Sequence, residues 1–400
     1  MEAAKTPDQA YISKTRIGVL AVSSMGMAAL AITPSYNAIA KSFALSATAV
    51  QMLTSLPNLF MMLAGLLMGK LTAGKIKLKN LTVIMMILCC AGGLLPLVYH
   101  GSFAFLLVCS CLVGLGQGAC TNLSQVLIAR MLPASERQST MGLTTTFTNL
   151  GGIVFIMGGG WLSSMSGWVA NYWIYLFAVL VLVTVLALVP LNPLPVDDGA
   201  SIPTGGKIKL NKYVFVCAGW SFCTMLLNNV LNNNISLFIA QEKLGSTAQA
   251  ALISTISLVG GMLCGFVVGQ IGKKFPHSSI ALAFFLYGLA YVFIGVCHNL
   301  IGIFIGSFIV GAAMSVAMGQ FAYMISIVVD QQSTSMALGV YQAINPIGGV
   351  ISPFVVNGLT SVTHMNAFTV SGILALVLAA AALGSGFQKH LLAYAQESQA

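Results

Sequence analysis

Stretches of about 20 apolar residues, the length needed to cross a bilayer, recur along the whole chain. Clear examples are residues 19–40, 81–99, 172–191 and 280–297. Only 6% of the residues are charged and 58% are apolar, which leaves too few charges to coat even one soluble domain. We therefore expect an integral membrane protein that has the lipid bilayer as a partner. The first apolar run is too long for a signal peptide and lacks a clear cleavage site, so we expect it to be retained.

Charged or turn-rich breaks between the apolar runs predict twelve membrane helices. None of the runs has the alternation that a lipid-facing strand needs, so the predicted fold class is all-α. The predicted helices are residues 16–40, 47–70, 80–99, 103–131, 139–164, 171–191, 212–240, 246–272, 278–297, 299–328, 333–360 and 365–388.

The positions of lysine and arginine predict the orientation in the membrane. If the N-terminus is cytoplasmic and the helices alternate in direction, all of the 17 basic residues except Lys41 and Lys243 fall on the cytoplasmic side. The net charge of +9 is then a topology signal rather than a nucleic-acid footprint, and no nucleic-acid partner is expected. Both termini are predicted to be cytoplasmic, in a multi-pass protein of the cell membrane.

The least membrane-like break lies at the middle of the chain and predicts two halves. Proline, glycine and both signs of charge mark a cytoplasmic linker there. The predicted parts are an N-terminal tail (1–15), a six-helix bundle (16–191), the linker (192–211), a second six-helix bundle (212–388) and a C-terminal tail (389–400).

The two halves also repeat in sequence. A shift of 196 residues carries Gly69 to Gly265 and Lys77 to Lys273, and a shift of 197 aligns Gly114 with Gly311. Six helices repeated in the same orientation, with the binding site between the halves, is a recurring plan of transporters.

The segment GFVVGQIGKK, residues 265–274, has the glycines and lysines of a phosphate-binding loop. Such a loop needs a preceding strand and a following helix in a soluble α/β unit, which the surrounding apolar runs exclude. A stripe of glycines every four residues instead favours close helix packing, and the two lysines favour a cytoplasmic turn.

With these features the chain resembles the major facilitator superfamily over essentially its whole length. That family carries G-x-x-x-D-R/K-x-G-R/K-R/K between helices 2 and 3 and again between helices 8 and 9. The resemblance implies a cytoplasmic gating motif made of Gly69, Lys77, Gly265, Gly269, Gly272, Lys273 and Lys274. Both copies lack the acid of the family motif, because Ala73 and Gly269 occupy its position.

Ionisable side chains are missing from the middle of every predicted helix. All eight acids and five histidines fall in loops, tails or helix ends. A mid-membrane carboxylate that carries protons is therefore absent, and the sequence leaves open whether transport is coupled to an ion. The nine cysteines are odd in number and form no CxxC pair, which argues against a disulfide frame or a metal site. No embedded catalytic cluster is visible either, and we expect no cofactor and no catalytic residue.

Neutral polar side chains mark the candidate substrate site. Five asparagines between residues 228 and 234 cannot all face lipid cheaply, and they also favour local unwinding of that helix. The plain alternative is that such residues hold helices together. In the family, helices 1, 4, 7 and 10 line the central cavity, so the resemblance favours as substrate-binding residues Asn37, Gln117, Thr121, Asn228, Asn232, Gln320 and Tyr323. The resemblance also implies three flanking candidates, Asn58, Asn149 and Asn345.

The sequence thus predicts a secondary transporter, which we expect to be monomeric, for a small organic solute that is neutral, zwitterionic or amphipathic. It would work by alternating access between two six-helix halves. Efflux of many lipophilic compounds is the alternative, since 20 methionines and 21 phenylalanines could make an adaptable cavity. A membrane sensor or enzyme is the remote alternative, because neither a catalytic cluster nor a sizeable soluble domain is visible.

Overall fold

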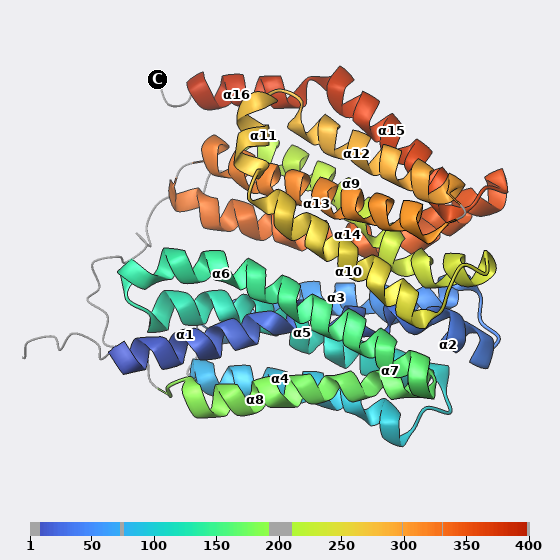
Figure 1. Cartoon of the computed structure of the whole chain (residues 1–400). Helices are drawn as coiled ribbons and strands as arrows, with labels where there is room; N and C mark the ends of the chain where they lie inside the picture. The colour runs from blue at the N-terminus through green and yellow to red at the C-terminus, as the bar shows by residue number, and fades with distance from the viewer. Residues whose placement is uncertain (1–8, 73–75, 192–209, 298, 330, 398–400) are drawn as a thin grey trace, which may run out of the picture. The chain divides into compact units, whose positions relative to one another are not determined.

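The computed structural model describes residues 9–72, 76–191, 210–297, 299–329 and 331–397, and within these ranges it contains helices and no strand (Figure 1). The elements in chain order are α1 (Gln9–Ser23), η1 (Ser24–Ser35), α2 (Tyr36–Ser42), α3 (Ala47–Leu71), α4 (Leu78–Val98), α5 (Phe103–Met131), α6 (Ala134–Ile153), η2 (Val154–Gly158), α7 (Gly159–Ser166), η3 (Trp168–Tyr175), α8 (Leu176–Leu188), α9 (Lys212–Gln241), α10 (Thr247–Gly265), α11 (Val268–Lys274), α12 (Ser279–Val296), α13 (Leu300–Val328), α14 (Gln331–Thr363), α15 (Ala367–Ser385) and α16 (Phe387–Glu397).

These elements confirm the all-α membrane fold that the apolar runs predict. Among the described residues, 11 segments are long and apolar enough to cross a membrane. The predicted span that is missing from this set is the fifth, which the structure divides into α6, the π-helical turn η2 and α7. The π turn interrupts the regular helix, and α6 is rich in Ser, Thr and Asn.

Two details differ from the predicted boundaries. The predicted helix 246–272 is two helices, because α10 ends at Gly265 and α11 begins at Val268. The predicted tail 389–400 largely forms α16, which starts after the left-handed residue Gly386 (φ 56°). Glycine suits that position because it has no Cβ to clash in the left-handed region.

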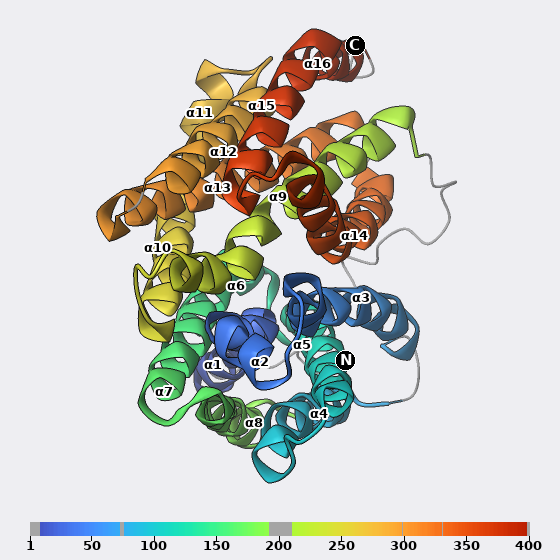
Figure 2. The same cartoon turned by 90° about the vertical axis from the view of Figure 1, so that its right-hand side faces the viewer.

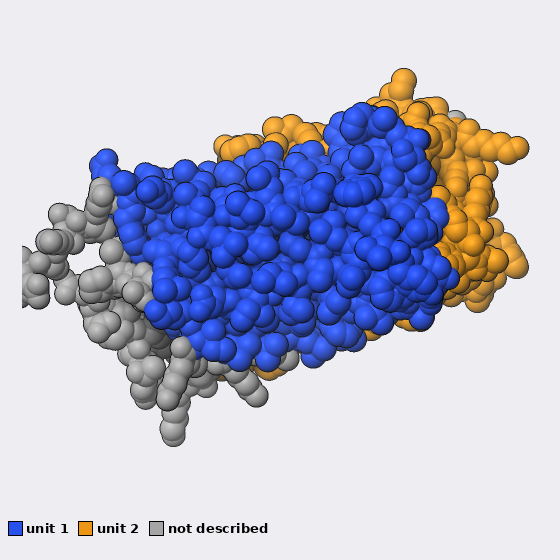
Figure 3. Space-filling model, turned by 90° about the horizontal axis from the view of Figure 1, so that it is seen from below, with its two compact units in different colours: residues 1–35, 56–201 blue, residues 36–55, 202–400 orange. Residues whose placement is uncertain are grey.

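Contacts divide the chain into two compact units, coloured separately in Figure 3. Unit 1 comprises residues 1–35 and 56–201, and unit 2 comprises residues 36–55 and 202–400. Within unit 1, α8 packs against α4 (Figure 2). Within unit 2, α11 and α16 both pack against α13. Most of the predicted linker lies outside the described residues, and the predicted division into two six-helix halves stays a prediction.

Glycines paired by the sequence repeat make equivalent close contacts in each unit. In unit 1, Gly114 of α5 lies against the backbone of Pro57 on α3. In unit 2, Gly311 of α13 lies against the backbone of Ser257 on α10. A Cβ on either glycine would collide with the facing main chain, so only glycine allows these helices to pack this closely.

Candidate functional site

In unit 1, the first membrane span loses its regular helix over η1. Met27 has φ −130° and ψ 20°, outside the helical region, and Pro34 lies near the end of the element. Such a break leaves main-chain groups that must find partners inside a membrane protein. Three side chains from two other elements, α5 and η3, supply them.

Each of these side chains bonds to a different main-chain group. Gln117 Oε1 on α5 accepts from the Ala29 N–H at 2.7 Å. The Tyr175 hydroxyl on η3 donates to the Ala28 carbonyl at 2.9 Å. Asn171, also on η3, donates to the Ala31 carbonyl at 2.9 Å. These bonds stabilise a discontinuous span, and in many transporters discontinuous helices line the substrate site.

The substrate-site candidates in unit 1 differ in how deeply their side chains are buried. Gln117 is buried and its side-chain oxygen Oε1 accepts from the main chain of η1, so its position supports a structural role in this conformation. Thr121 lies one turn further along α5 and is exposed, and its hydroxyl donates to the main-chain carbonyl of Gln117 at 3.0 Å. Asn58 on α3 and Asn149 on α6 are half-buried.

In unit 2, the asparagines of α9 divide into buried and half-buried side chains. Asn229 and Asn234 are buried and donate to carbonyls of their own helix, those of Met225 and Val230, at 2.9 Å each. α9 is a continuous helix from Lys212 to Gln241, so the unwinding that the sequence favours there does not occur. The third buried asparagine, Asn233, accepts from Thr54.

Asn228 and Asn232 are the half-buried pair, one helical turn apart on α9. The Tyr287 hydroxyl on α12 donates to Asn228 Oδ1 at 3.3 Å. The Asn232 side chain makes no hydrogen bond to any residue that the structure describes. The two amides therefore keep hydrogen-bonding capacity, whereas the amide nitrogens of Asn229 and Asn234 are bonded to carbonyls of their own helix.

A second polar cluster in unit 2 joins residues 36–55 to α9 and α14. Gln51 is fully buried and donates to the Asn233 carbonyl at 3.0 Å and to Asn234 Oδ1 at 2.9 Å. The side-chain oxygen of Gln51, Oε1, accepts from Asn357 Nδ2 at 2.8 Å. We call residues Tyr36, Gln51, Thr54, Asn233, Asn234 and Asn357 the amide latch.

The remaining bonds of the amide latch run through hydroxyl groups. Thr54 donates to Asn233 Oδ1 at 3.1 Å, and the Tyr36 hydroxyl lies 2.5 Å from Thr54 Oγ1. Nearby, the Asn37 N–H donates to Ser236 Oγ at 3.3 Å, which places this predicted site residue beside α9 through its main chain. The latch contains no charge, so its strength comes from hydrogen bonds alone.

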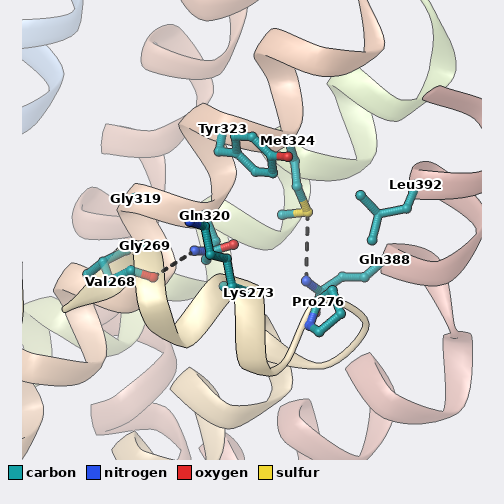
Figure 4. Close-up of a pocket in the computed structure, with 11 residues that line it drawn as sticks. Val268, Gly269, Lys273, Pro276, Gly319, Gln320, Tyr323, Met324, Gln388 and Leu392 are labelled. Atoms are coloured by element: carbon teal, nitrogen blue, oxygen red, sulfur yellow. Dashed lines mark hydrogen bonds between the residues drawn. The ribbon is translucent and has the colours of Figure 1, made fainter. Parts of the chain in front are cut away.

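Another group of candidates meets in a cavity of about 400 Å³ within unit 2 (Figure 4). The structure brings together residues that the sequence assigns to two different roles. Gly269, Gly272 and Lys273 belong to the predicted gating motif, and Gln320 and Tyr323 belong to the predicted substrate site. They come from α11 and α13, and α16 closes the cavity through Gln388 and Leu392. Gln320 is buried and donates to the Val268 carbonyl at 3.2 Å, whereas Tyr323 is 55% exposed.

The other candidates lie apart from this cavity's lining. Asn345 is buried on α14, where its amide lies 3.4 Å from the Met318 sulfur. Gly265 ends α10, and Lys274 lies 5.8 Å from the centre of the Phe275 ring. Lys77 is exposed directly before α4. Gly69 falls within α3.

Sequence reasoning missed residues whose role depends on a distant partner. Asn171, Tyr287, Asn357 and Gln388 each bond a different element, and none stands out from its neighbours in sequence. The available signal was an amide or phenol inside or beside an apolar span, which needs a partner in hydrocarbon.

Comparison with known proteins agrees with this architecture. The family model described as Major Facilitator Superfamily matches residues 17–353 and 217–388. A bacterial homolog of the human lysosomal transporter Spinster is 16% identical, with 97% of this chain and 95% of that chain covered and a TM-score of 0.72. A POT family transporter in complex with 5-aminolevulinic acid is 14% identical, with 96% and 97% covered and a TM-score of 0.73. A search of curated protein sequences gave no match.

At these identities the solved structures show a shared fold, while the family match extends over most of the chain. The chain belongs to the major facilitator superfamily, and it is a membrane transporter rather than an enzyme.

Proposed function

We propose that this protein moves a small organic solute, neutral, zwitterionic or amphipathic, across the cell membrane by alternating access. The observation that carries the proposal is the half-buried amide pair Asn228 and Asn232 on α9. Amides offer both donors and acceptors but no charge, which suits a solute whose own charge is zero or internally balanced. The POT family neighbour in complex with 5-aminolevulinic acid, an amino acid, supports the same solute class.

The amide latch supports the alternating-access part of the proposal. Residues 36–55 connect the first two spans in sequence, yet they bond α9 and α14 through Gln51. Opening of the outer side of the transporter would require these bonds to break. An uncharged latch suits such a cycle, because neutral hydrogen bonds between membrane helices are individually weak, about 0.6 kcal/mol on average.

A thermal-shift screen of the purified protein against metabolites, repeated at several pH values, identifies the solute, because a bound ligand stabilises the folded state by mass action. Uptake into proteoliposomes then tests transport. Saturation and acceleration by unlabelled solute on the opposite side are the expected signs of a carrier. Linear, unsaturable flux would contradict alternating access.

Variants of α9 test the site. Asn228→Ala and Asn232→Ala are each expected to weaken solute affinity while the protein stays folded. Asn229→Ala is the matched control, since its side chain is buried and bonds its own helix. Unchanged affinity in both test variants would refute the site, and stabilisation by unrelated lipophilic compounds alone would favour the efflux alternative.

A further inference from the structure

The cavity beneath α16 has the chemistry of a second site, separate from the amide pair of α9. Its lining combines one cation, Lys273, with a polar floor formed by the amides of Gln320 and Gln388 and with an apolar wall (Figure 4). The apolar wall consists of Val268, Pro276, Met324 and Leu392. A ligand that satisfies both parts has a charged head and an apolar body.

The amides that line the cavity are already used by the protein. Gln320 donates to the Val268 carbonyl at 3.2 Å and accepts from Ser279 Oγ at 3.5 Å. Gln388 donates to Ser279 Oγ at 2.9 Å and accepts from the Ile280 N–H at 3.0 Å. This chain of bonds joins α11, α13, α12 and α16, so it builds a fixed floor instead of offering open partners to a ligand.

Lys273 therefore determines the charge that the cavity prefers. No aspartate or glutamate occurs between Glu242 and Asp330, or between Asp330 and Glu397, in the sequence. All three segments that line the cavity, from α11, α13 and α16, fall inside these acid-free stretches. A cation with no acid in the surrounding segments favours an anionic head group.

The residues beside the lining indicate the apolar part of the ligand. Phe266 is 81% exposed, and Val267 and Phe275, which directly precede lining residues, are exposed as well. Exposed aromatic and aliphatic side chains at the end of a membrane helix face lipid, and Tyr323 supplies an aromatic ring of the kind that gathers at the membrane interface. A free inorganic anion would leave this wall unused.

We propose that this cavity binds the acidic head group of an anionic phospholipid from the cytoplasmic leaflet, with its chains along the exposed apolar strip of Phe266, Val267 and Phe275. Basic pockets between membrane helices on the cytoplasmic side bind acidic lipid head groups in this way. Because α16 and α11 share the cavity, the lipid would hold the C-terminal helix to the glycine-rich 265–274 segment.

Titration of the full-length protein in neutral detergent with phosphatidylglycerol tests the proposal, with phosphatidylcholine of identical chains and inorganic phosphate as separate arms. Lipid retained on the protein is counted by native mass spectrometry, and stability is followed by thermal shift. We expect phosphatidylglycerol to bind and stabilise most. Lys273→Gln should weaken it about fivefold, since one lysine near anionic lipid contributes about that factor.

Two matched pairs of variants separate the cavity from a general basic surface. Lys274→Gln is the control for Lys273→Gln, because Lys274 does not line the cavity. Gly269→Leu adds a side chain at a lining position and Gly265→Leu adds one outside the lining, and a Cβ at either glycine meets no atom within 4 Å. We expect only Lys273→Gln and Gly269→Leu to reduce phosphatidylglycerol binding.

Three outcomes would overturn the proposal. Equal binding of phosphatidylcholine would remove the charge preference, and equal stabilisation by inorganic phosphate would show that the chains contribute nothing. Equal losses in Lys273→Gln and Lys274→Gln would show a diffuse basic surface in place of a built site.

Discussion

Replacing Gln51 by leucine is expected to loosen residues 36–55 from α9 and α14. Leucine fills a similar volume but removes the two bonds that Gln51 donates, at 3.0 and 2.9 Å, and the one that it accepts, at 2.8 Å. At 0.5–1.5 kcal/mol for a typical bond and about 0.6 kcal/mol between membrane helices, three bonds contribute about 2 kcal/mol. That free energy corresponds to about a 30-fold change in the equilibrium between the bonded and released states.

Labelling of a cysteine placed at Asn37 measures this release. Asn37 is half-buried and its main chain bonds Ser236 at 3.3 Å, so its exposure depends on the latch. The nine native cysteines are first replaced, since those that are half-buried would react as well. The Gln51→Leu variant should react with a membrane-impermeant maleimide up to about 30-fold faster, provided that opening is rapid compared with labelling.

Ser42→Ala is the matched control in the same segment. The Ser42 hydroxyl is exposed and bonds only to Ala38 of its own helix among the described residues, so its loss should leave the labelling rate unchanged. An equal rate in the Gln51→Leu variant and the parent would refute the reasoning, because it would show that the amide latch does not hold residues 36–55 in place. Faster labelling in both variants would point to general loosening instead.

Three further outcomes are expected. Gln117→Leu leaves the buried Ala29 N–H unpaired and should cost about 1–3 kcal/mol, seen as a lower thermal denaturation temperature. Gly311→Val drives a side chain into the backbone of α10 and should abolish the folded fraction in size-exclusion chromatography, while Gly358→Val meets no atom within 4 Å of its Cβ and should elute normally. Glu136→Gln breaks the ion pair with Arg16, whose side chains are both about one-third exposed, so the free energy of unfolding by urea or heat should change by less than about 1 kcal/mol.

Much of the fold follows from the sequence because a bilayer leaves few solutions. Apolar length determines where a helix crosses, and basic residues mark its loops, so local composition carries the information. The sequence repeat aligned Gly114 with Gly311, and the structure shows that each faces main chain in its own unit. Among the described residues, the close helix packing expected at Gly265 and Gly269 is absent, since a Cβ at either glycine meets no atom within 4 Å. The sequence also predicted the fifth span, at residues 139–164, but it did not show that a π turn divides this span into α6, η2 and α7.

The candidate sites were predicted less completely, and α9 shows why. The sequence marked its asparagines as a group, but hydrogen bonding divides them: Asn229 and Asn234 bond their own helix, and Asn228 and Asn232 stay half-buried. A periodicity gives the face of a helix without giving the partner that meets each side chain. For the same reason the sequence favoured unwinding in α9, whereas the break lies in η1.

The sequence by itself thus determined that this chain is a bundle of membrane helices and that its two halves align in sequence, because both follow from residue type and spacing along one dimension. Only the tertiary structure decided that Gln117 supports the broken first span, that Gln51 anchors residues 36–55, and that Lys273 shares a cavity with α16. Each of these depends on which distant groups satisfy one another's hydrogen bonds or charge in an environment without water. That choice is made by packing in three dimensions, and no local pattern records it.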